Sequence, residues 1–198
     1  MVSVNNFEAQ VRNTIAASIT TKQHLLADTD LITTVSRVTE VLIASFKAGN
    51  KVLLFGNGGS AADAQHIAAE FVGRFAFDRP ALPALALSVN TSCVTAIGND
   101  YGFDVVFSRQ IEALGQRGDV AVGITTSGNS PNVLRAMATA VKMGLHTVGM
   151  TGSKTSKLTD VVEHCIRVPS SETPRIQECH ILVGHIISEL VERAIFHA

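Results

Sequence analysis

An apolar run, a glycine-rich turn and an alanine-rich segment follow one another between Val52 and Glu70, and this order restricts what the chain can fold into. The run Val52–Phe55 has the pattern of a buried strand, and the residues after Ser60 favour a helix. We expect Ser60 to be the helix N-cap, because Asp63 follows it three residues later. Backbone N–H groups in such a turn, together with the helix dipole, attract an anion. The stretch therefore predicts an anion site at the end of a buried strand.

The size and composition of the chain narrow the possible classes of protein. Its 198 residues fit one domain, and 46% hydrophobic against 17% charged residues indicates a large core or a surface covered by another subunit. A net charge of −1 gives no electrostatic footprint for nucleic acid. Apolar runs are strand-sized and the first ten residues lack a secretory pattern, so we expect no membrane span and no signal peptide. Cys93, Cys165 and Cys179 lack metal-type spacing, which indicates reduced thiols in a cytoplasm.

Predicted strands and helices alternate along the chain. Residues 5–49 carry two apolar helical stripes, and the first helix should pack either on another subunit or on its own sheet. Residues 99–102 should form a turn. Strands are expected at 52–55, 83–87, 119–124, 145–150 and 161–168, and further helices at 91–97, 105–114, 131–143 and from about 173 onward. The alternation predicts an α/β fold with a mostly parallel sheet, helices on both faces, and ligands at the carboxyl ends of the strands.

A second loop at that edge carries four hydroxyl side chains in the six residues Thr125–Ser130. Ser130 as N-cap and Pro131 as the first helical residue predict the helix that follows. Several hydroxyl donors beside a second glycine turn favour a phosphate site. Because neither loop contains Lys or Arg, a phosphate monoester suits the site better than a polyphosphate.

The glycine turn also matches a weaker motif. Gly56, Gly58 and Ala61 fit the dinucleotide-binding pattern, but the acidic residue expected near the end of the next strand is missing. NAD is therefore disfavoured. The chain has no G-x-x-x-x-G-K-[ST] sequence, which excludes a P-loop.

Two predicted helices carry polar side chains that need partners. His66 and Glu70 are four residues apart and share one helix face. Gln177 and His185 lie about two turns apart on the last helix, among apolar residues, and His180 competes for the same role. These groups suit either an N/O site for a divalent metal such as zinc or an acid/base pair.

Four segments together resemble the sugar isomerase (SIS) domain family: 56–60, the His66/Glu70 pair, 125–130 and 175–185. More narrowly, the chain is similar to the bacterial phosphoheptose isomerases, which convert sedoheptulose 7-phosphate to D-glycero-D-manno-heptose 7-phosphate. The resemblance implies a three-layer sandwich with a flavodoxin-like five-stranded parallel sheet and extra N-terminal helices, forming a single SIS domain over residues 1–198. It also implies a cytoplasmic homotetramer with sites at subunit contacts. The reaction begins ADP-heptose synthesis for lipopolysaccharide.

The resemblance further implies a role for individual residues. Glu70 would be the base and His185 the acid. One zinc ion per subunit would be held by His66, Glu70, Gln177 and His185. The substrate would contact Asn57, Gly58, Gly59, Ser60, Glu70, Asn99, Asp100, Thr125, Thr126, Ser127, Ser130 and Gln177. Thr125 replaces the Ser of some members and keeps the hydroxyl, whereas Pro174 replaces an Asp, so a role for that carboxylate is not expected here.

An aldose–ketose isomerisation through an enediol fits the predicted spacing. Six residues separate Ser60 from His66, about 9 Å of helix, so a phosphate at the helix tip would place the reacting carbons near His66 and Glu70. A Glu70 bound to zinc would be a poorer base, so it would have to leave the metal or share it. The alternatives are a non-catalytic SIS protein that binds the replication initiator DnaA, and a sugar-phosphate-binding regulatory domain. Glu70 and His185 together favour the enzyme.

Overall fold

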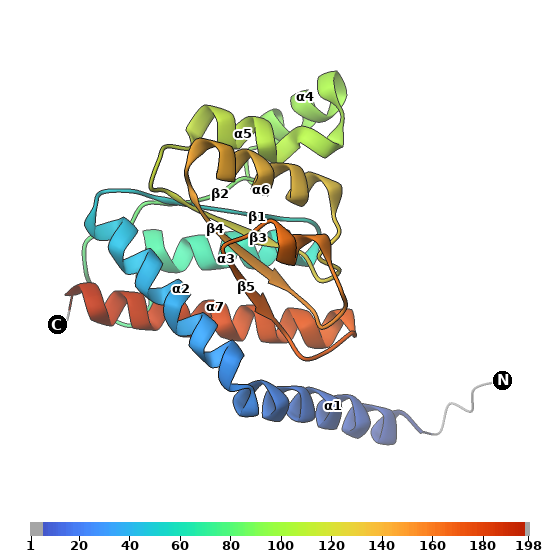
Figure 1. Cartoon of the computed structure of the whole chain (residues 1–198). Coiled ribbons are helices and arrows are strands. Elements are labelled where there is room, and N and C mark those ends of the chain that lie inside the picture. Colours follow the sequence, from blue (N-terminus) through green and yellow to red (C-terminus); the bar gives the residue numbers. More distant parts are fainter. Residues whose placement is uncertain (1–5, 197–198) are drawn as a thin grey trace.

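Five parallel strands form one sheet in the order β2-β1-β3-β4-β5 in the computed structural model, which describes residues 6–196 (Figure 1). The strands are β1 (Val52–Gly56), β2 (Ala84–Ala86), β3 (Val120–Ile124), β4 (His146–Thr151) and β5 (His164–Arg167). This is the flavodoxin-like order of a doubly wound sheet. The predicted five-stranded parallel sheet is therefore confirmed.

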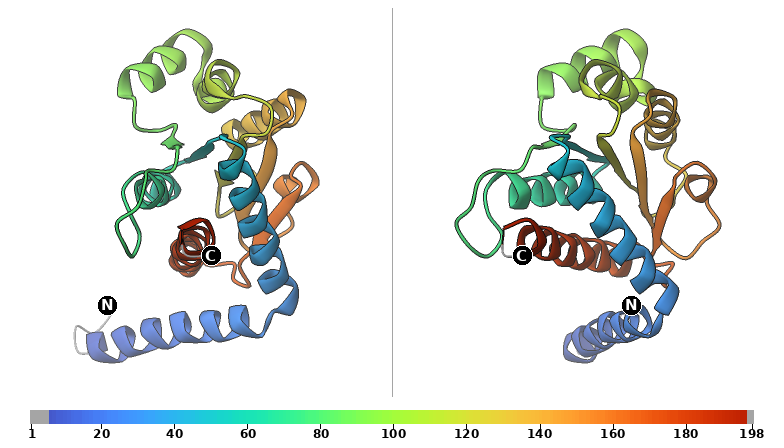
Figure 2. Two further views of the ribbon diagram at one scale, coloured as in Figure 1. Left: turned by 90° about the vertical axis from the view of Figure 1, so that its left-hand side faces the viewer. Right: turned by 60° about the vertical axis from the view of Figure 1, so that its left-hand side comes forward.

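Helices cover both faces of the sheet, which gives the three expected layers (Figure 2). The α-helices are α1 (Phe7–Ala27), α2 (Thr29–Lys47), α3 (Gly59–Val72), α4 (Thr91–Tyr101), α5 (Val106–Leu114), α6 (Pro131–Met143) and α7 (Thr173–Phe196), and two 3-10 turns are η2 (Phe103–Val105) and η3 (Lys157–Asp160). On one face α2, α3 and α7 enclose a core with the sheet, and on the other α5 and α6 enclose a second core. The helix α4 packs against α5 and η2 outside that second core.

The strand register brings the two predicted ligand loops together. Gly56, the last residue of β1, pairs with Ile124, the last residue of β3. The loops that lead into α3 and α6 therefore start side by side at the carboxyl edge. Gly58 adopts φ +55 as the chain turns into α3, a conformation that glycine adopts without strain.

The two N-terminal helices behave differently. The helix α2 buries one side against the sheet and α7, whereas α1 extends away from the body below α7 (Figure 1). Only Thr21 and Leu25 of α1 are buried, and its apolar stripe is exposed, from 64% at Phe7 to 52% at Ile19. Packing of α1 on its own sheet is therefore wrong, and packing on another subunit stays a prediction. Asn5, the first residue of the expected helical region, lies outside the described residues.

Three local predictions are corrected. Gly58, not Ser60, is the N-cap of α3, and Ser60 is a buried residue inside its first turn. Residues 99–101 continue α4, which ends only at Gly102 with φ +91, so the turn predicted at 99–102 begins too early. The fifth strand starts at His164 rather than 161, because the N–H groups of residues 161 and 162 bond to the carbonyl of Leu158 in a turn instead of pairing with β4.

Two predictions from composition concern membrane spans and the state of the cysteines. No helix within residues 6–196 is long and apolar enough to span a membrane. Cys93, Cys165 and Cys179 are free thiols, and burial raises the pKa of Cys165 to about 11 despite the nearby Arg167.

Candidate active site

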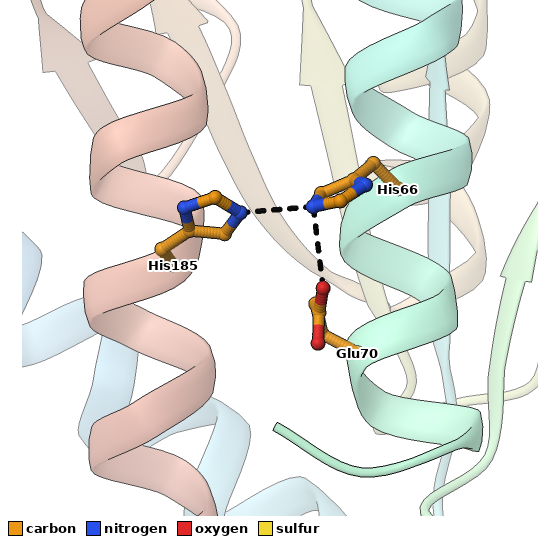
Figure 3. Close-up of side chains that lie close together, drawn as sticks. All are labelled: His66, Glu70 and His185. Atoms are coloured by element: carbon orange, nitrogen blue, oxygen red, sulfur yellow. Dashed lines mark hydrogen bonds and ion pairs between the residues drawn. The ribbon is translucent and has the colours of Figure 1, made fainter. Parts of the chain in front are cut away.

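A cluster of three side chains joins α3 to α7. His66 and Glu70 project from α3 toward His185 of α7 (Figure 3). The Nε2 atoms of His66 and His185 are 2.9 Å apart, and Nε2 of His66 lies 3.2 Å from Oε1 of Glu70. The side chain of His66 is 52% exposed and that of Glu70 is 20% exposed, so the cluster is open on one side. Two helices far apart in the sequence thus bring together three of the four predicted metal ligands.

One proton cannot satisfy the contacts of His66. If Nε2 of His66 carries a hydrogen and donates to Glu70, that nitrogen has no lone pair to accept a hydrogen bond from His185. If Nε2 of His66 instead accepts from His185, its lone pair also faces the carboxylate oxygen of Glu70, which is repulsive. A cation shared by the three atoms resolves this conflict. With Zn–N bonds of 2.0–2.1 Å, tetrahedral ligands lie about 3.3 Å apart, close to the two separations observed. The cluster therefore fits a divalent metal that binds N and O ligands.

The other two polar residues of α7 occupy different places. Gln177 lies against the start of α3: a Cβ on Gly59 would be 2.3 Å from its Nε2 atom. Gly59 precedes His66 by seven residues, about 10 Å of helix, so the Gln177 amide lies beside the glycine loop, at the end of α3 away from Glu70. His180 is fully buried, and its Nε2 atom faces the carbonyl of Thr151 at 3.3 Å. Burial lowers the pKa of His180 to about 4. It is thus a neutral core histidine and does not compete for the cluster.

Hydroxyl groups converge in the loop between β3 and α6. Oγ1 of Thr125 lies 2.9 Å from Oγ of Ser130 and 3.4 Å from Oγ of Ser127. Ser130 is the N-cap and Pro131 begins α6, as predicted, although the Ser130 hydroxyl bonds to Thr125 instead of capping the helix. Three donors that face one point beside a helix N-terminus suit a phosphate group.

The glycine loop is tied to this hydroxyl loop by a pair of amides. Asn57 and Asn132 exchange two hydrogen bonds of 2.9 and 2.8 Å, and Oδ1 of Asn132 also accepts the N–H of Val133. Asn132 is 2% exposed. The sequence analysis missed it, although a polar residue directly after an N-terminal Pro of a helix was a usable signal. The pair holds both loops in a fixed relation.

Asp63 is a second residue that the sequence analysis placed only in a helix cap. It lies one turn before His66, and its Oδ2 atom is buried with no hydrogen-bond partner in the part of the chain described. Burial raises the pKa of its carboxyl, and the nearby His66 partly offsets this. No sequence signal distinguished this Asp from an ordinary first-turn residue.

Two further predicted substrate contacts, Asn99 and Asp100, come from α4, and a third, Thr126, comes from the loop after β3. Asn99 and Asp100 lie in the last turn of α4, on the face of the sheet opposite α3 and α7, where the amide of Asn99 donates to Asp100 at 2.8 Å. Thr126 lines a cavity between the loops that follow β3, β4 and β5, together with its neighbour Ser127 and with Ser153. Within one chain, then, Asn99 and Asp100 are not brought to the cluster, and their role stays a prediction.

Comparisons with known proteins identify relatives of this chain. Residues 9–152 match the SIS domain family. The phosphoheptose isomerase of Aneurinibacillus thermoaerophilus is 53% identical over 186 residues, which cover 94% of each chain. The structure of a phosphoheptose isomerase from Neisseria gonorrhoeae superposes with a TM-score of 0.88 at 41% identity, covering 93% of this chain and 98% of that one. One from Francisella tularensis gives 0.89 at 32% identity, covering 93% and 97%. The chain belongs to the SIS domain family and, within it, to the phosphoheptose isomerases.

Proposed function

We propose that this protein, as a single SIS domain, isomerises D-sedoheptulose 7-phosphate to D-glycero-D-manno-heptose 7-phosphate, the first step of ADP-heptose synthesis for lipopolysaccharide. The observation that carries the proposal is the convergence of His66, Glu70 and His185 in a member of the phosphoheptose isomerases. The relatives named above do not favour a DnaA-binding protein or a regulatory domain.

Substrate binding would begin with the phosphate. Hydroxyls of Thr125, Ser127 and Ser130 and the N–H groups of the glycine loop would hold it, with Asn57 kept in place by Asn132. Thr126 and Ser60 would complete this end. The sugar would then extend along α3 past Gln177 toward His66, about 9 Å from Ser60. Binding at one end thus aligns the reacting carbons at the other.

Proton transfer would be carried out by Glu70 and His185. Glu70 would remove a proton from C1 of the ketose while His185, which carries its ring proton on Nδ1 when Nε2 binds a metal, would give that proton to O2, which forms the enediol. Glu70 returns its proton to C2, and His185 takes the proton from O1, which leaves the aldose. One oxygen of Glu70 faces His66 and the other is turned away (Figure 3). Glu70 can therefore contribute one oxygen to a metal and keep the other as the base.

We further propose that the cluster holds one zinc ion per subunit, with His66, Glu70 and His185 as ligands. Gln177, whose amide lies beside Gly59 in the structure, would become the fourth ligand by turning its side chain toward the cluster. The N/O donor set and the separations of the three atoms support this assignment. The ion would polarise the substrate oxygens at C1 and C2. An open side next to His66 leaves room for those oxygens.

A homotetramer with sites at subunit contacts is part of the same proposal. The exposed apolar stripe of α1 needs a partner, and Asn99 and Asp100 would reach a site only on a neighbouring subunit. We place the enzyme in the cytoplasm, where its three free thiols stay reduced.

The test is turnover of sedoheptulose 7-phosphate by the wild type and by Glu70→Gln. The wild type should form the aldose, and the variant should lose at least about 1000-fold in kcat while keeping its circular dichroism spectrum. Near wild-type turnover by the variant would remove Glu70 from the chemistry, and no turnover by the metal-loaded wild type would refute the activity.

A further inference from the structure

A buried ion pair lies beside the cluster, between the loop after α3 and the last turns of α7. The side chains of Arg79 and Glu192 are 2% and 1% exposed, and Nε of Arg79 donates to Oε1 of Glu192 at 3.0 Å. Glu192 also accepts the backbone N–H groups of Phe75 at 2.8 Å and Ala76 at 2.7 Å. The carboxylate of one helix thus anchors the loop that follows the other.

The same pair reaches both halves of the cluster. Arg79 donates to the backbone carbonyl of Glu70 at 2.8 Å and to that of Phe71 at 2.6 Å, so it holds the last turns of α3. Phe75, whose N–H is held by Glu192, places its ring 5.8 Å from the imidazole of His185, centroid to centroid. One side of the pair therefore fixes Glu70, and the other fixes the ring against which His185 packs.

We propose that Arg79 and Glu192 are positioning residues: they set the separation of α3 and α7 at which His66 and Glu70 meet His185. A buried ion pair contributes little net stability compared with apolar side chains of the same volume, so stability alone does not account for it. The pair makes four hydrogen bonds with backbone atoms in and just after α3, which is the arrangement that a fixed separation requires. The catalytic part of this inference rests on the proposed isomerase activity, but the metal-binding part does not.

The chain offers a matched control at the start of β1 and β3. Asp119 is likewise 1% exposed, and it accepts the N–H groups of Lys51 and Gln116 and pairs with Nζ of Lys51 at 2.6 Å. It has the same chemistry as Glu192, a buried carboxylate with two backbone donors and one cation. It adjoins the first residues of β1 and β3, and its side-chain hydrogen bonds go to Lys51 and Gln116 rather than to α3 or α7. Asp119→Asn therefore reports the general effect of losing such a carboxylate.

The experiment compares Glu192→Gln with Asp119→Asn and wild type. Zn²⁺ affinity is measured by competition with a chromogenic chelator, and kcat and KM are measured on sedoheptulose 7-phosphate. Both variants should lose thermal stability, but only Glu192→Gln should bind Zn²⁺ about 10-fold or more weakly, with kcat lowered to a similar extent and KM within about two-fold. Equal Zn²⁺ affinity and kcat in the two variants would show that the ion pair is only structural and overturn the proposal.

A third variant keeps the test decisive if Glu192→Gln does not fold. Arg79→Lys retains a cation beside Glu192 but cannot reach the carbonyls of Glu70 and Phe71 together, and it should show the same selective loss. Wild-type Zn²⁺ affinity and kcat in Arg79→Lys would refute the inference. A wild type that binds Zn²⁺ but does not turn over the sugar would refute the proposed function instead, and the affinity comparison would still decide the positioning role.

Discussion

We expect the buried His180 to make the free energy of unfolding of this protein depend on pH. The imidazole is fully buried, and burial lowers its pKa to about 4, against 6.5 for an exposed histidine. The unfolded chain therefore binds a proton between pH 6.5 and pH 4 that the folded chain does not. Because the unfolded state binds more protons in this window, the free energy of unfolding rises with pH. As the pH falls, the protein loses the part of that free energy that comes from keeping His180 neutral.

The magnitude follows from the two pKa values. A full difference of about 2.5 units corresponds to about 3.4 kcal/mol, reached below pH 4, and about 2 kcal/mol of this is lost between pH 7 and pH 5. His180→Leu removes the titrating group while filling a similar volume. The carbonyl of Thr151 stays satisfied in the variant, because it also accepts the N–H of Val168 at 2.9 Å. The substitution should therefore cost little at pH 7.

Urea unfolding of the wild type and His180→Leu at pH 5, 6 and 7 is the measurement. The difference between the two free energies isolates His180, because the other titrating groups are common to both proteins. The wild type should lose about 2 kcal/mol more than the variant between pH 7 and pH 5. Curves that stay parallel within about 0.5 kcal/mol would refute a buried neutral His180.

Four further expectations follow from the structure. Gly128 has φ +64, and a Cβ at this position would lie 2.2 Å from the Cβ of Ser156. Gly128→Ala should therefore lower the free energy of unfolding by about 1–3 kcal/mol and raise KM, and an unchanged urea midpoint would contradict this. Asn132→Ala breaks the amide pair with Asn57 and should cost about 1–3 kcal/mol and raise KM more than it lowers kcat, in the same assays. Ile15→Glu introduces a charge into the exposed stripe of α1 and should reduce the mass measured by light scattering, whereas an unchanged mass would exclude the stripe from a subunit interface. Chelation should abolish turnover and added Zn²⁺ should restore it; full activity after chelation would rule out a metal role.

Local chemistry made most of the fold predictable. Continuous apolar runs such as Val52–Phe55 are typical of buried parallel strands, and the residues between them carry helical periodicity. Element ends were less predictable, since they depend on backbone conformation. Gly58 turns the chain before Ser60 can cap α3, and Gly102 rather than residue 99 ends α4.

The candidate site was predictable in its parts but not in its assembly. His66 and Glu70 share a face by helix geometry alone, whereas their contact with His185 joins residues 119 apart in sequence. Sequence spacing could not separate His185 from His180, because only packing shows that one faces α3 and the other is buried against Thr151. Asn132, Arg79 and Glu192 escaped prediction for the same reason: their partners come from other elements.

By itself, then, the sequence determined the alternation of strands and helices, the two ligand loops at one sheet edge, and the polar residues available to a site. Those features depend on residues only a few positions apart, and such residues can be read from the sequence directly. The tertiary structure alone decided which histidine meets Glu70, where Gln177 lies and that α1 packs away from the sheet. Such outcomes depend on how helices pack across the core, and that is a balance of many side-chain contacts distant in the chain.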